Sequence, residues 1–202
     1  MMRSLALRCG GCTLALLLAA CAGPQVKPVA ANADLLTRQA EREQVVSARA
    51  EWRLSGRLGV SDGRDSGSGS LEWTQRSDEF RFSVHAPVTG KTWTLSGTPR
   101  RAVLEGLREQ PLEGDAADLL ARELGWQVPV AELTRWVRGL RTSPQSRITF
   151  TADGLPATID EAGWHVQYQG YDTAFDPPLP SKVFASKGDY KVRLAIREWT
   201  LR

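Results

Sequence analysis

The sequence predicts a mainly β domain of the α+β class, in which a curved antiparallel sheet is covered by helices. Three observations lead to this prediction. Segments in the first and last thirds of the chain alternate apolar and polar residues with a period of two, as half-buried strands do. Turn-forming residues separate these segments at hairpin spacing. Between the two groups of strands, residues 115–139 carry apolar residues at helical spacing instead.

The composition is that of an ordinary globular domain. The chain has 202 residues, of which 42% are hydrophobic and 24% are charged. These values exclude a collagen-like, disordered or disulfide-stapled protein. No apolar run reaches the roughly 20 residues that a membrane-spanning helix needs, which excludes a polytopic membrane protein.

The first 20 residues have the layout of a secretory signal peptide. Arg3 and Arg8 precede an apolar run over residues 10–20 that is too short to span a bilayer. The run ends in Leu-Ala-Ala-Cys at residues 18–21, which resembles the bacterial lipobox, where the cysteine is acylated and becomes the first residue. The alternative is a buried N-terminal helix with an ordinary cysteine. We expect a signal peptide over residues 1–20 and a lipid anchor on Cys21.

Cleavage before Cys21 also changes the charge and cysteine content. It removes two basic residues and no acidic residue, so the formal charge falls from +3 to +1 and a nucleic-acid partner is not expected. Cys9 and Cys12 leave as well, so the folded domain has no free thiol, disulfide or thiolate metal ligand. Ala22 stands where enteric-type bacteria place the Asp of an inner-membrane retention signal, which favours the outer membrane.

The segment after the cysteine predicts a tether and then a helix. Residues 22–33 are small, contain prolines and are nearly uncharged, so we expect the lipidated N-terminus and a flexible tether over residues 21–33. A single folded domain is expected over residues 34–202. Asp34 is expected to cap a helix that runs to about Arg49.

From Trp52 the sequence period changes to two, which predicts consecutive antiparallel strands. The Gly- and Ser-rich stretch 61–70 is expected to be a loop. Gly90 with the following Lys-Thr matches only the end of a P-loop, because the required earlier glycine is His85; a hairpin turn is the better interpretation. The strands expected in this part lie near residues 52–60, 71–73, 80–86 and 92–96.

The middle of the chain predicts two helices, and the strands then return. Asp115 is expected to begin the first helix and Gly125 to end it, whereas Pro129 begins the second and Gly139 ends it. In the last strand, the apolar positions change parity after Ile196, which predicts a bulge near residue 198. The later strands are expected near residues 148–150, 157–159, 164–168, 183–185 and 190–201.

The sequence does not favour catalysis. The only histidines, His85 and His165, lie at polar positions of expected strands, and no G-x-S-x-G motif accompanies them. Asp172 and Asp176 lie among turn residues. We expect no enzyme activity, no cofactor and no metal.

Most tryptophans lie on apolar faces, where two interpretations remain open. Trp52, Trp73, Trp93 and Trp164 share the apolar faces of expected strands, and Trp136 shares that of a helix. Either they fill a packed core, or the concave face of the sheet is too wide to fill and leaves an apolar cavity.

A set of short motifs in fixed order resembles the LolB family, the outer-membrane lipoprotein receptors of Gram-negative bacteria. With the lipobox, these motifs cover nearly the whole mature chain. They are W-x-L-x-G-R-L from Trp52, L-x-W from Leu71, A-P-V from Ala86, L-G-W-x-V-P-V from Leu124, L-x-x-W-V-x-G from Leu133, G-W-x-V-x-Y from Gly163, L-P from Leu179 and I-x-x-W-x-L from Ile196.

The resemblance implies an incomplete β-barrel with a helical lid around an apolar cavity for acyl chains. It implies a monomer in the outer membrane, facing the periplasm, that accepts acylated lipoproteins from the periplasmic carrier LolA and inserts them into outer-membrane lipid. The candidate cavity residues are Trp52, Leu54, Leu58, Leu71, Trp73, Phe82, Val84, Trp93, Leu95, Trp136, Trp164 and Tyr168.

The resemblance also implies a protruding membrane-delivery loop, here Pro87, Val88, Thr89 and Gly90. The family motif there is proline–leucine–glycine, so this chain has a smaller tip residue and a displaced glycine. Two other functions remain open. One is a structural or assembly-accessory outer-membrane lipoprotein with a packed core, and the other is a lipid-anchored hydrolase.

Overall fold

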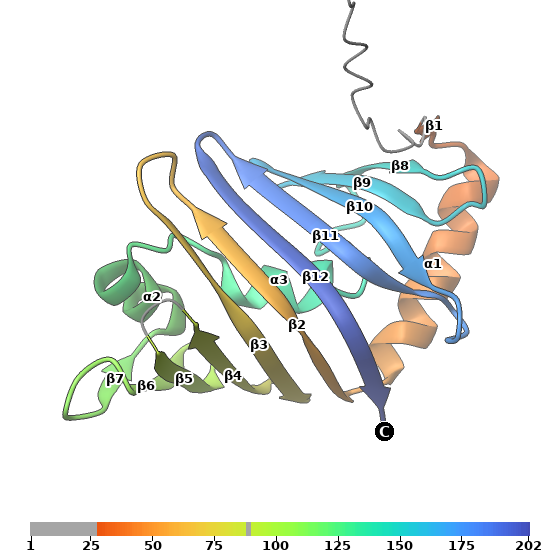
Figure 1. The fold of residues 1–202 in the computed structure, drawn as a ribbon. Helices are drawn as coiled ribbons and strands as arrows, with labels where there is room; N and C mark the ends of the chain where they lie inside the picture. The colour runs from red at the N-terminus through yellow and green to blue at the C-terminus, as the bar shows by residue number, and fades with distance from the viewer. Residues whose placement is uncertain (1–27, 88–89) are drawn as a thin grey trace, which may run out of the picture.

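The computed structural model describes residues 28–87 and 90–202, whose strands form one antiparallel sheet of 12 strands (Figure 1). Their spatial order is β1-β8-β9-β10-β11-β12-β2-β3-β4-β5-β6-β7. The strands are β1 (Val29–Ala30), β2 (Glu51–Ser61), β3 (Ser66–Arg76), β4 (Glu79–Ala86), β5 (Lys91–Thr98), β6 (Arg101–Glu105), β7 (Leu112–Gly114), β8 (Arg147–Phe150), β9 (Pro156–Glu161), β10 (Trp164–Asp172), β11 (Leu179–Lys187) and β12 (Tyr190–Leu201). The last strand therefore lies beside β2, in the middle of the sheet.

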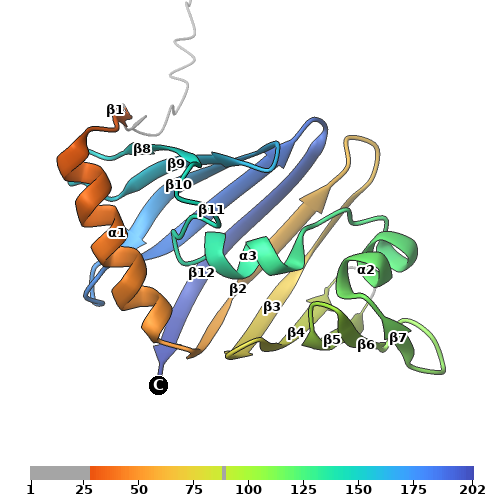
Figure 2. The ribbon, with the colours of Figure 1, turned by 180° about the vertical axis from the view of Figure 1, so that it is seen from behind.

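The sheet is curved and open, and helices cover its concave face. Strands β1 and β7 are its two edges, and no ladder within the described residues joins them. The helices are α1 (Ala33–Ala48), α2 (Ala116–Leu124) and α3 (Val130–Trp136). Figure 2 shows α1 on the β8–β11 side, α2 on the β4–β7 side and α3 between them. The prediction of an open, curved antiparallel sheet under helices is confirmed.

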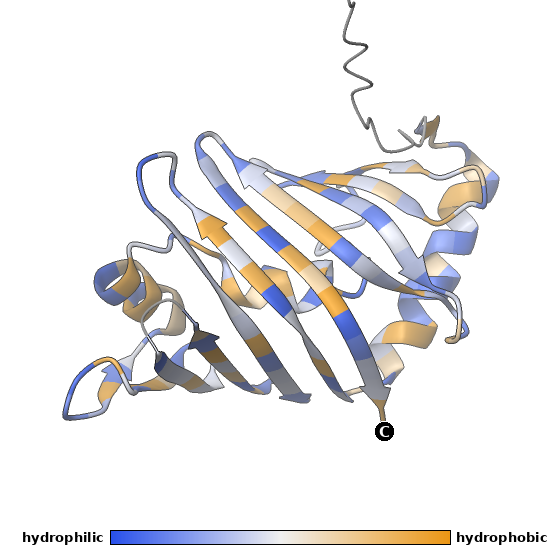
Figure 3. Cartoon of the chain, viewed as in Figure 1, coloured by the Kyte–Doolittle hydropathy of each residue, from blue (hydrophilic) through white to orange (hydrophobic). Residues whose placement is uncertain are grey.

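The core lies between the concave face and the helices, because the strands alternate as predicted. Figure 3 shows the bands of apolar and polar residues along the central strands. Trp73 is nearly completely buried at the centre, with its ring centroid 4.9 Å from that of Trp52 and 4.3 Å from that of Phe82. In β12 the register shifts between Ile196 and Glu198, and the buried positions change parity there. The predicted bulge is confirmed.

Helix α1 begins two residues earlier than predicted, at a different cap. The Asn32 side chain accepts a hydrogen bond of 2.9 Å from the backbone N–H of Leu35. Asp34 lies in the first turn and pairs with Arg38 four residues later. The prediction that Asp34 caps the helix is therefore wrong, because Asn32 has the extended backbone and acceptor oxygen that a cap requires.

The caps of α2 are those predicted. Asp115 accepts hydrogen bonds from the backbone N–H groups of Ala117 and Asp118, at 2.9 and 3.3 Å. Gly125 ends the helix in the left-handed region, with φ of 69°, where a residue without Cβ is favoured. This turn directs the chain away from α2 and toward α3.

Two segments predicted to be irregular belong to the sheet. Residues 66–70 of the Gly- and Ser-rich stretch form the first half of β3, and only residues 62–65 connect it to β2. A Cβ atom at Gly69 would lie 2.6 Å from the carbonyl oxygen of His85, so the glycine permits close approach of β4. Residues 29–30, expected in the tether, pair with β8 as β1.

Candidate functional site

An apolar chamber lies between the concave face of the sheet and a lid, which we define as α2, the connector 125–129 and α3. Its cavity volume is about 50 Å³. Only apolar side chains line it. Those from the sheet are Leu58, Val60, Leu71, Trp73, Phe82, Val84, Trp93, Val192 and Leu194, and those from the lid are Leu120, Trp126, Val128, Val130, Leu133 and Val137.

Half of the candidate cavity residues line this chamber. Those that do are Leu58, Leu71, Trp73, Phe82, Val84 and Trp93. The others are buried but pack elsewhere in the core: Trp52, Leu54, Leu95, Trp136, Trp164 and Tyr168. Of the five tryptophans considered, Trp73 and Trp93 therefore line this space, whereas Trp52, Trp136 and Trp164 do not. The sequence prediction misses the lid side of the chamber, although the apolar stripes of α2 and α3 were a signal for it.

The chamber is too small to hold an acyl chain in this structure. Pockets that hold small molecules have volumes of roughly 300–1,000 Å³, several times the space found here. An acyl chain could enter only if the lid moved away from the sheet, which would expose the apolar side chains on both sides. Chemically, the chamber is an apolar, uncharged surface, which movement of the lid would expose.

A wider funnel leads from the surface to one end of the chamber. It has a volume of about 280 Å³ and lies between the β2–β3 hairpin, strands β4 and β5, and the end of α2. Its rim includes Asp62, Asp65 and Ser66, and it shares Trp93 and Trp126 with the chamber. The rings of these two tryptophans meet edge-on, with centroids 5.5 Å apart. Val60 and Val84 also line both spaces, so the funnel and the chamber meet at these four side chains.

The residues on either side of the expected membrane-delivery loop belong to this funnel. Ala86 and Lys91, which flank the loop, both line the funnel. Pro87 and Gly90 lie in the turn between β4 and β5, and the Gly90 N–H donates to the Ala86 carbonyl at 2.9 Å. The hairpin predicted at Gly90 is thus confirmed. Val88 and Thr89 lie outside the described residues, as does Cys21.

Two buried arginines join α1 to the end of α3. Arg42 of α1 donates to the carbonyls of Gly139 and Arg138, each at 3.0 Å, and to that of Pro178 at 2.8 Å. In return, Arg138 donates to the carbonyl of Val46 near the end of α1, at 3.3 Å. Each arginine therefore binds backbone carbonyls at or just beyond the C-terminal end of the other helix.

Burial affects the charge of both arginines without removing it. It lowers the pKa of Arg42, and it lowers the pKa of Arg138 to about 10, with help from the nearby Arg135 and Arg42. Both groups remain charged near neutral pH. The Arg138 guanidinium also lies 5.4 Å from the ring centroid of Trp52, in a cation–π contact. These residues carry no sequence signal, since arginines on helices are ordinarily exposed.

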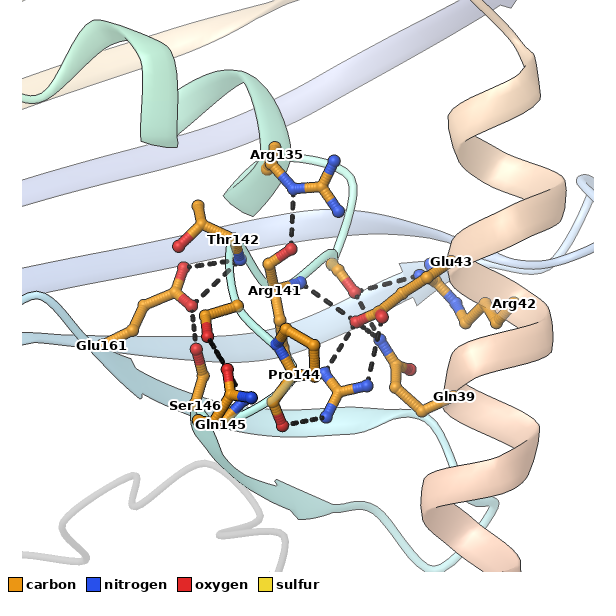
Figure 4. A network of polar contacts seen from close by, with 12 residues as sticks. Gln39, Arg42, Glu43, Arg135, Arg141, Thr142, Pro144, Gln145, Ser146 and Glu161 are labelled. Carbon is orange, nitrogen blue, oxygen red and sulfur yellow. Dashed lines mark hydrogen bonds and ion pairs between the residues drawn. The ribbon is translucent and has the colours of Figure 1, made fainter.

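A second polar link lies beside the first (Figure 4). Glu43 of α1 accepts two hydrogen bonds from the Arg141 guanidinium, at 2.8 and 3.1 Å, and one from Gln39 at 2.9 Å. Burial opposes ionisation of Glu43, but the hydrogen bonds from Arg141 and Gln39 outweigh it and hold the pKa of the carboxyl below its ordinary value. The segment after α3 is therefore fixed to α1 by charge as well as by packing.

The C-terminal end of α3 is also bound to the sheet. The Tyr168 hydroxyl of β10 donates to the Trp136 carbonyl at 3.0 Å, and the Trp136 indole N–H donates to the Glu161 carboxylate of β9. Burial raises the pKa of the Tyr168 hydroxyl well above its ordinary value, so it stays a donor. Trp136 and Tyr168, predicted to line the cavity, instead anchor this end of the lid.

The histidines do not form a site together. His85 bonds the Thr92 hydroxyl at 2.9 Å, and His165 bonds Asp160 at 2.5 Å, both on exposed parts of strands. Within residues 28–87 and 90–202, no cluster of His, Cys, Asp or Glu side chains has the makings of a metal site. No helix in that part of the chain is long and apolar enough to cross a membrane.

Sequence comparison gives consistent relatives. The family described as "Outer membrane lipoprotein LolB" matches residues 50–199. The chain is 38% identical over 173 residues to the outer-membrane lipoprotein LolB of Xanthomonas campestris pv. campestris (strain B100), which covers 81% of this chain and 79% of that one. It is 35% identical to the protein of the same name from Pseudomonas putida (strain GB-1), with 94% of each chain covered.

Solved structures share the fold at low sequence identity. A LolA superfamily protein from Nitrosomonas europaea superposes with a TM-score of 0.53 at 10% identity, over 84% of this chain and 92% of the other. A putative outer membrane lipoprotein-sorting protein domain from Vibrio parahaemolyticus gives 0.52 at 7% identity, over 83% and 93%. The chain shares the fold of these two proteins, and by the match over residues 50–199 and the identity to its relatives it belongs to the LolB family.

Proposed function

We propose that this protein receives acylated lipoproteins from the periplasmic carrier LolA and inserts them into the outer membrane. It would be held in that membrane by an acylated Cys21 and would face the periplasm. The observation that carries the proposal is the chamber between sheet and lid, which only apolar side chains line. The names of its relatives add the outer membrane and the lipoprotein class.

The physical chemistry of the cargo supports the proposal. Each methylene of an acyl chain gains ~0.8 kcal/mol when it leaves water, so exposed chains cannot cross an aqueous compartment unshielded. A receptor has to cover the chains and then give them up. Transfer can run down a gradient of affinity, from the carrier to the receptor and finally to the bilayer, without another energy source.

The position of the 87–90 loop supports the delivery step. Its flanking residues line the funnel that leads to the chamber. Cargo leaving the chamber by that funnel would pass the ends of β4 and β5 that carry this loop.

The deciding experiment is the transfer of a labelled lipoprotein. A purified complex of LolA with one radiolabelled lipoprotein is mixed with this protein, and the two are separated by affinity capture. We expect the label to move to this protein and then, when liposomes are added, to the liposomes. Label that stays on the carrier would refute the proposal.

A dye measurement separates the proposal from the packed, assembly-accessory alternative. The dye bis-ANS becomes fluorescent in apolar cavities, and an acylated lipoprotein should displace it from this protein. The same lipoprotein without its acyl chains is the control and should not displace the dye. Equal displacement by both forms would favour a protein-binding surface over an acyl chamber.

A further inference from the structure

On the lid side, Trp126 is the side chain that lines both the funnel and the chamber, whereas Val60, Val84 and Trp93 line both from the sheet. Trp126 lies directly after the left-handed Gly125 that ends α2. Its ring meets that of Trp93 on β5, with centroids 5.5 Å apart and planes at 71°. On the other side, its Cζ2 atom would lie 3.3 Å from a Cβ atom at Gly67 of β3. The indole therefore spans from the lid to two strands.

The lid is held firmly at its other end. The chain after α3 is tied to α1 and to the sheet by Arg42, Tyr168 and the Glu43–Arg141 pair. By contrast, no hydrogen bond in the described part of the chain joins residues 125–129 to a strand. The Gly125 and Trp126 N–H groups both donate back into α2. Displacement of the connector from the sheet therefore breaks apolar contacts but no hydrogen bonds.

From these observations we propose that the funnel is the portal by which one acyl chain enters and leaves the chamber, and that Trp126 is the gate residue. The inference rests on the proposed function, since it assigns a route to the acyl chain. The gate opens when the indole leaves Trp93 and Gly67, while the anchored end of α3 stays in place.

The side chains of the chamber and of the funnel indicate where the apolar and the polar end of an acyl ligand would bind. The chamber behind Trp126 is lined only by apolar side chains, so it accepts a hydrocarbon chain. The funnel rim carries carboxylate and hydroxyl groups, including Asp62, Asp65 and Ser66, which remain hydrated. A chain with a polar head therefore enters tail first and leaves its head at the rim.

A competing route would pass on the other side of the connector. A shallow groove there is lined by Tyr190 of β12, Gln127 and Pro129. Charged side chains, including Asp118 and Lys187, contribute to its surface, and it shares Val128 with the chamber but neither Trp93 nor Trp126. Tyr190 is half-buried and aromatic, so it provides a matched control for Trp126.

The route is tested by photocrosslinking the full mature chain held in lipid nanodiscs. The photoreactive residue p-benzoylphenylalanine replaces one aromatic residue at a time: Trp126 at the gate, Tyr190 in the competing groove, or Phe82 in the chamber. The probe is carbon-13-labelled palmitic acid, so mass spectrometry distinguishes its adducts from those of the nanodisc lipid. We expect labelled adducts at positions 126 and 82 and none above background at 190.

The other outcomes separate the two hypotheses. Adducts at positions 82 and 190 without one at 126, or an adduct at 190 as strong as that at 126, would overturn the portal. No adduct at position 82 would mean that the chamber does not take an acyl chain, which would overturn the proposed function and the portal with it.

The gate itself is tested by stopped-flow binding of cis-parinaric acid to the same nanodisc-held chain. Loss of an edge-to-face aromatic pair changes an equilibrium by up to about tenfold, so Trp126→Ala should raise uptake and release rates by about that factor. Because both rates rise together, the affinity for cis-parinaric acid should change little. The rates of Trp126→Phe should lie between those of the wild type and of Trp126→Ala. The control Leu58→Ala widens the chamber behind the gate and should change release alone. Unchanged uptake in Trp126→Ala would overturn the gate, even if affinity fell.

Discussion

Replacement of Arg42 by methionine tests whether the buried arginines fix the lid. Methionine keeps much of the length of the side chain and removes every donor. Three carbonyls then lose the guanidinium: those of Gly139, Arg138 and Pro178. The Gly139 carbonyl keeps a second donor, the Gln39 amide at 3.1 Å. The other two keep no other hydrogen bond from the described residues.

The expected loss of stability follows from the carbonyls of Arg138 and Pro178. A buried polar group left without a partner costs about 1–3 kcal/mol, so two such groups cost about 2–6 kcal/mol. Part of this loss of stability is offset, because burial of the Arg42 guanidinium, whose Nε has no hydrogen-bond partner, already costs desolvation energy in the wild type. We expect Arg42→Met to lower the free energy of unfolding by about 3 kcal/mol, which a domain of ordinary stability survives.

Equilibrium urea unfolding followed by tryptophan fluorescence measures this change. Arg49→Met is the matched control, because Arg49 lies at the end of the same helix and makes one exposed hydrogen bond, to the Asp176 carbonyl at 2.6 Å. The control should change stability by less than about 0.5 kcal/mol. If Arg42→Met costs no more than this control, the two arginines do not hold the lid, and the fixed end assigned to α3 is wrong.

Three further predictions follow. Cys21→Ala, exported with a cleavable signal, should give a folded and soluble protein that still accepts lipoprotein but delivers it to membranes less selectively; circular dichroism showing unfolding would contradict this. Val88→Glu should change stability by less than about 0.5 kcal/mol and slow release of lipoprotein into liposomes, because a charge resists entry into the interface. Val88→Leu should preserve or improve release, and normal delivery by Val88→Glu would exclude the loop as the delivery element. Burial raises the pKa of both Tyr168 and Tyr171, so the stability they provide is complete below the ordinary tyrosine pKa of about 10 and is lost above it. The urea midpoint of the wild type should therefore fall above pH 10, against the opposite effect of the lowered pKa values of Arg42 and Arg138. This fall should be less steep in Tyr171→Phe.

The fold was largely predictable, because local patterns specify most of it. The alternation of apolar and polar residues predicted the long strands. The change in the parity of the apolar positions after Ile196 predicted the bulge. Asp115 and Gly125 marked the ends of α2 correctly because each has a residue type suited to its cap. The errors arose where two nearby residues were equally suited to cap a helix, or where pairing with a distant strand determined the local structure. Asn32 and Asp34 are both good caps, and the glycines of β3 resemble a loop until β4 lies against them.

The site was predictable only on its sheet side. Periodicity shows that Trp73 and Trp136 both face inward, but not that one lines a space and the other is anchored by hydrogen bonds. That difference depends on where the helices lie over the sheet, which is set by contacts between distant segments. Arg42 and Arg138 were missed for the same reason, since their burial depends on carbonyls far away in the chain.

The position of β12 has a consequence for how the domain folds. Residues 190–201 supply the strand that joins β2 to β11, so the strands on either side of it share no ladder partner until it is in place. Its pairing of Leu201 with Trp52 closes a loop through most of the domain, and such long-range pairing makes folding slow. A chain made from its N-terminus cannot complete the sheet before these residues are available. The complete sheet therefore forms after synthesis has reached β12, rather than strand by strand as the chain is made.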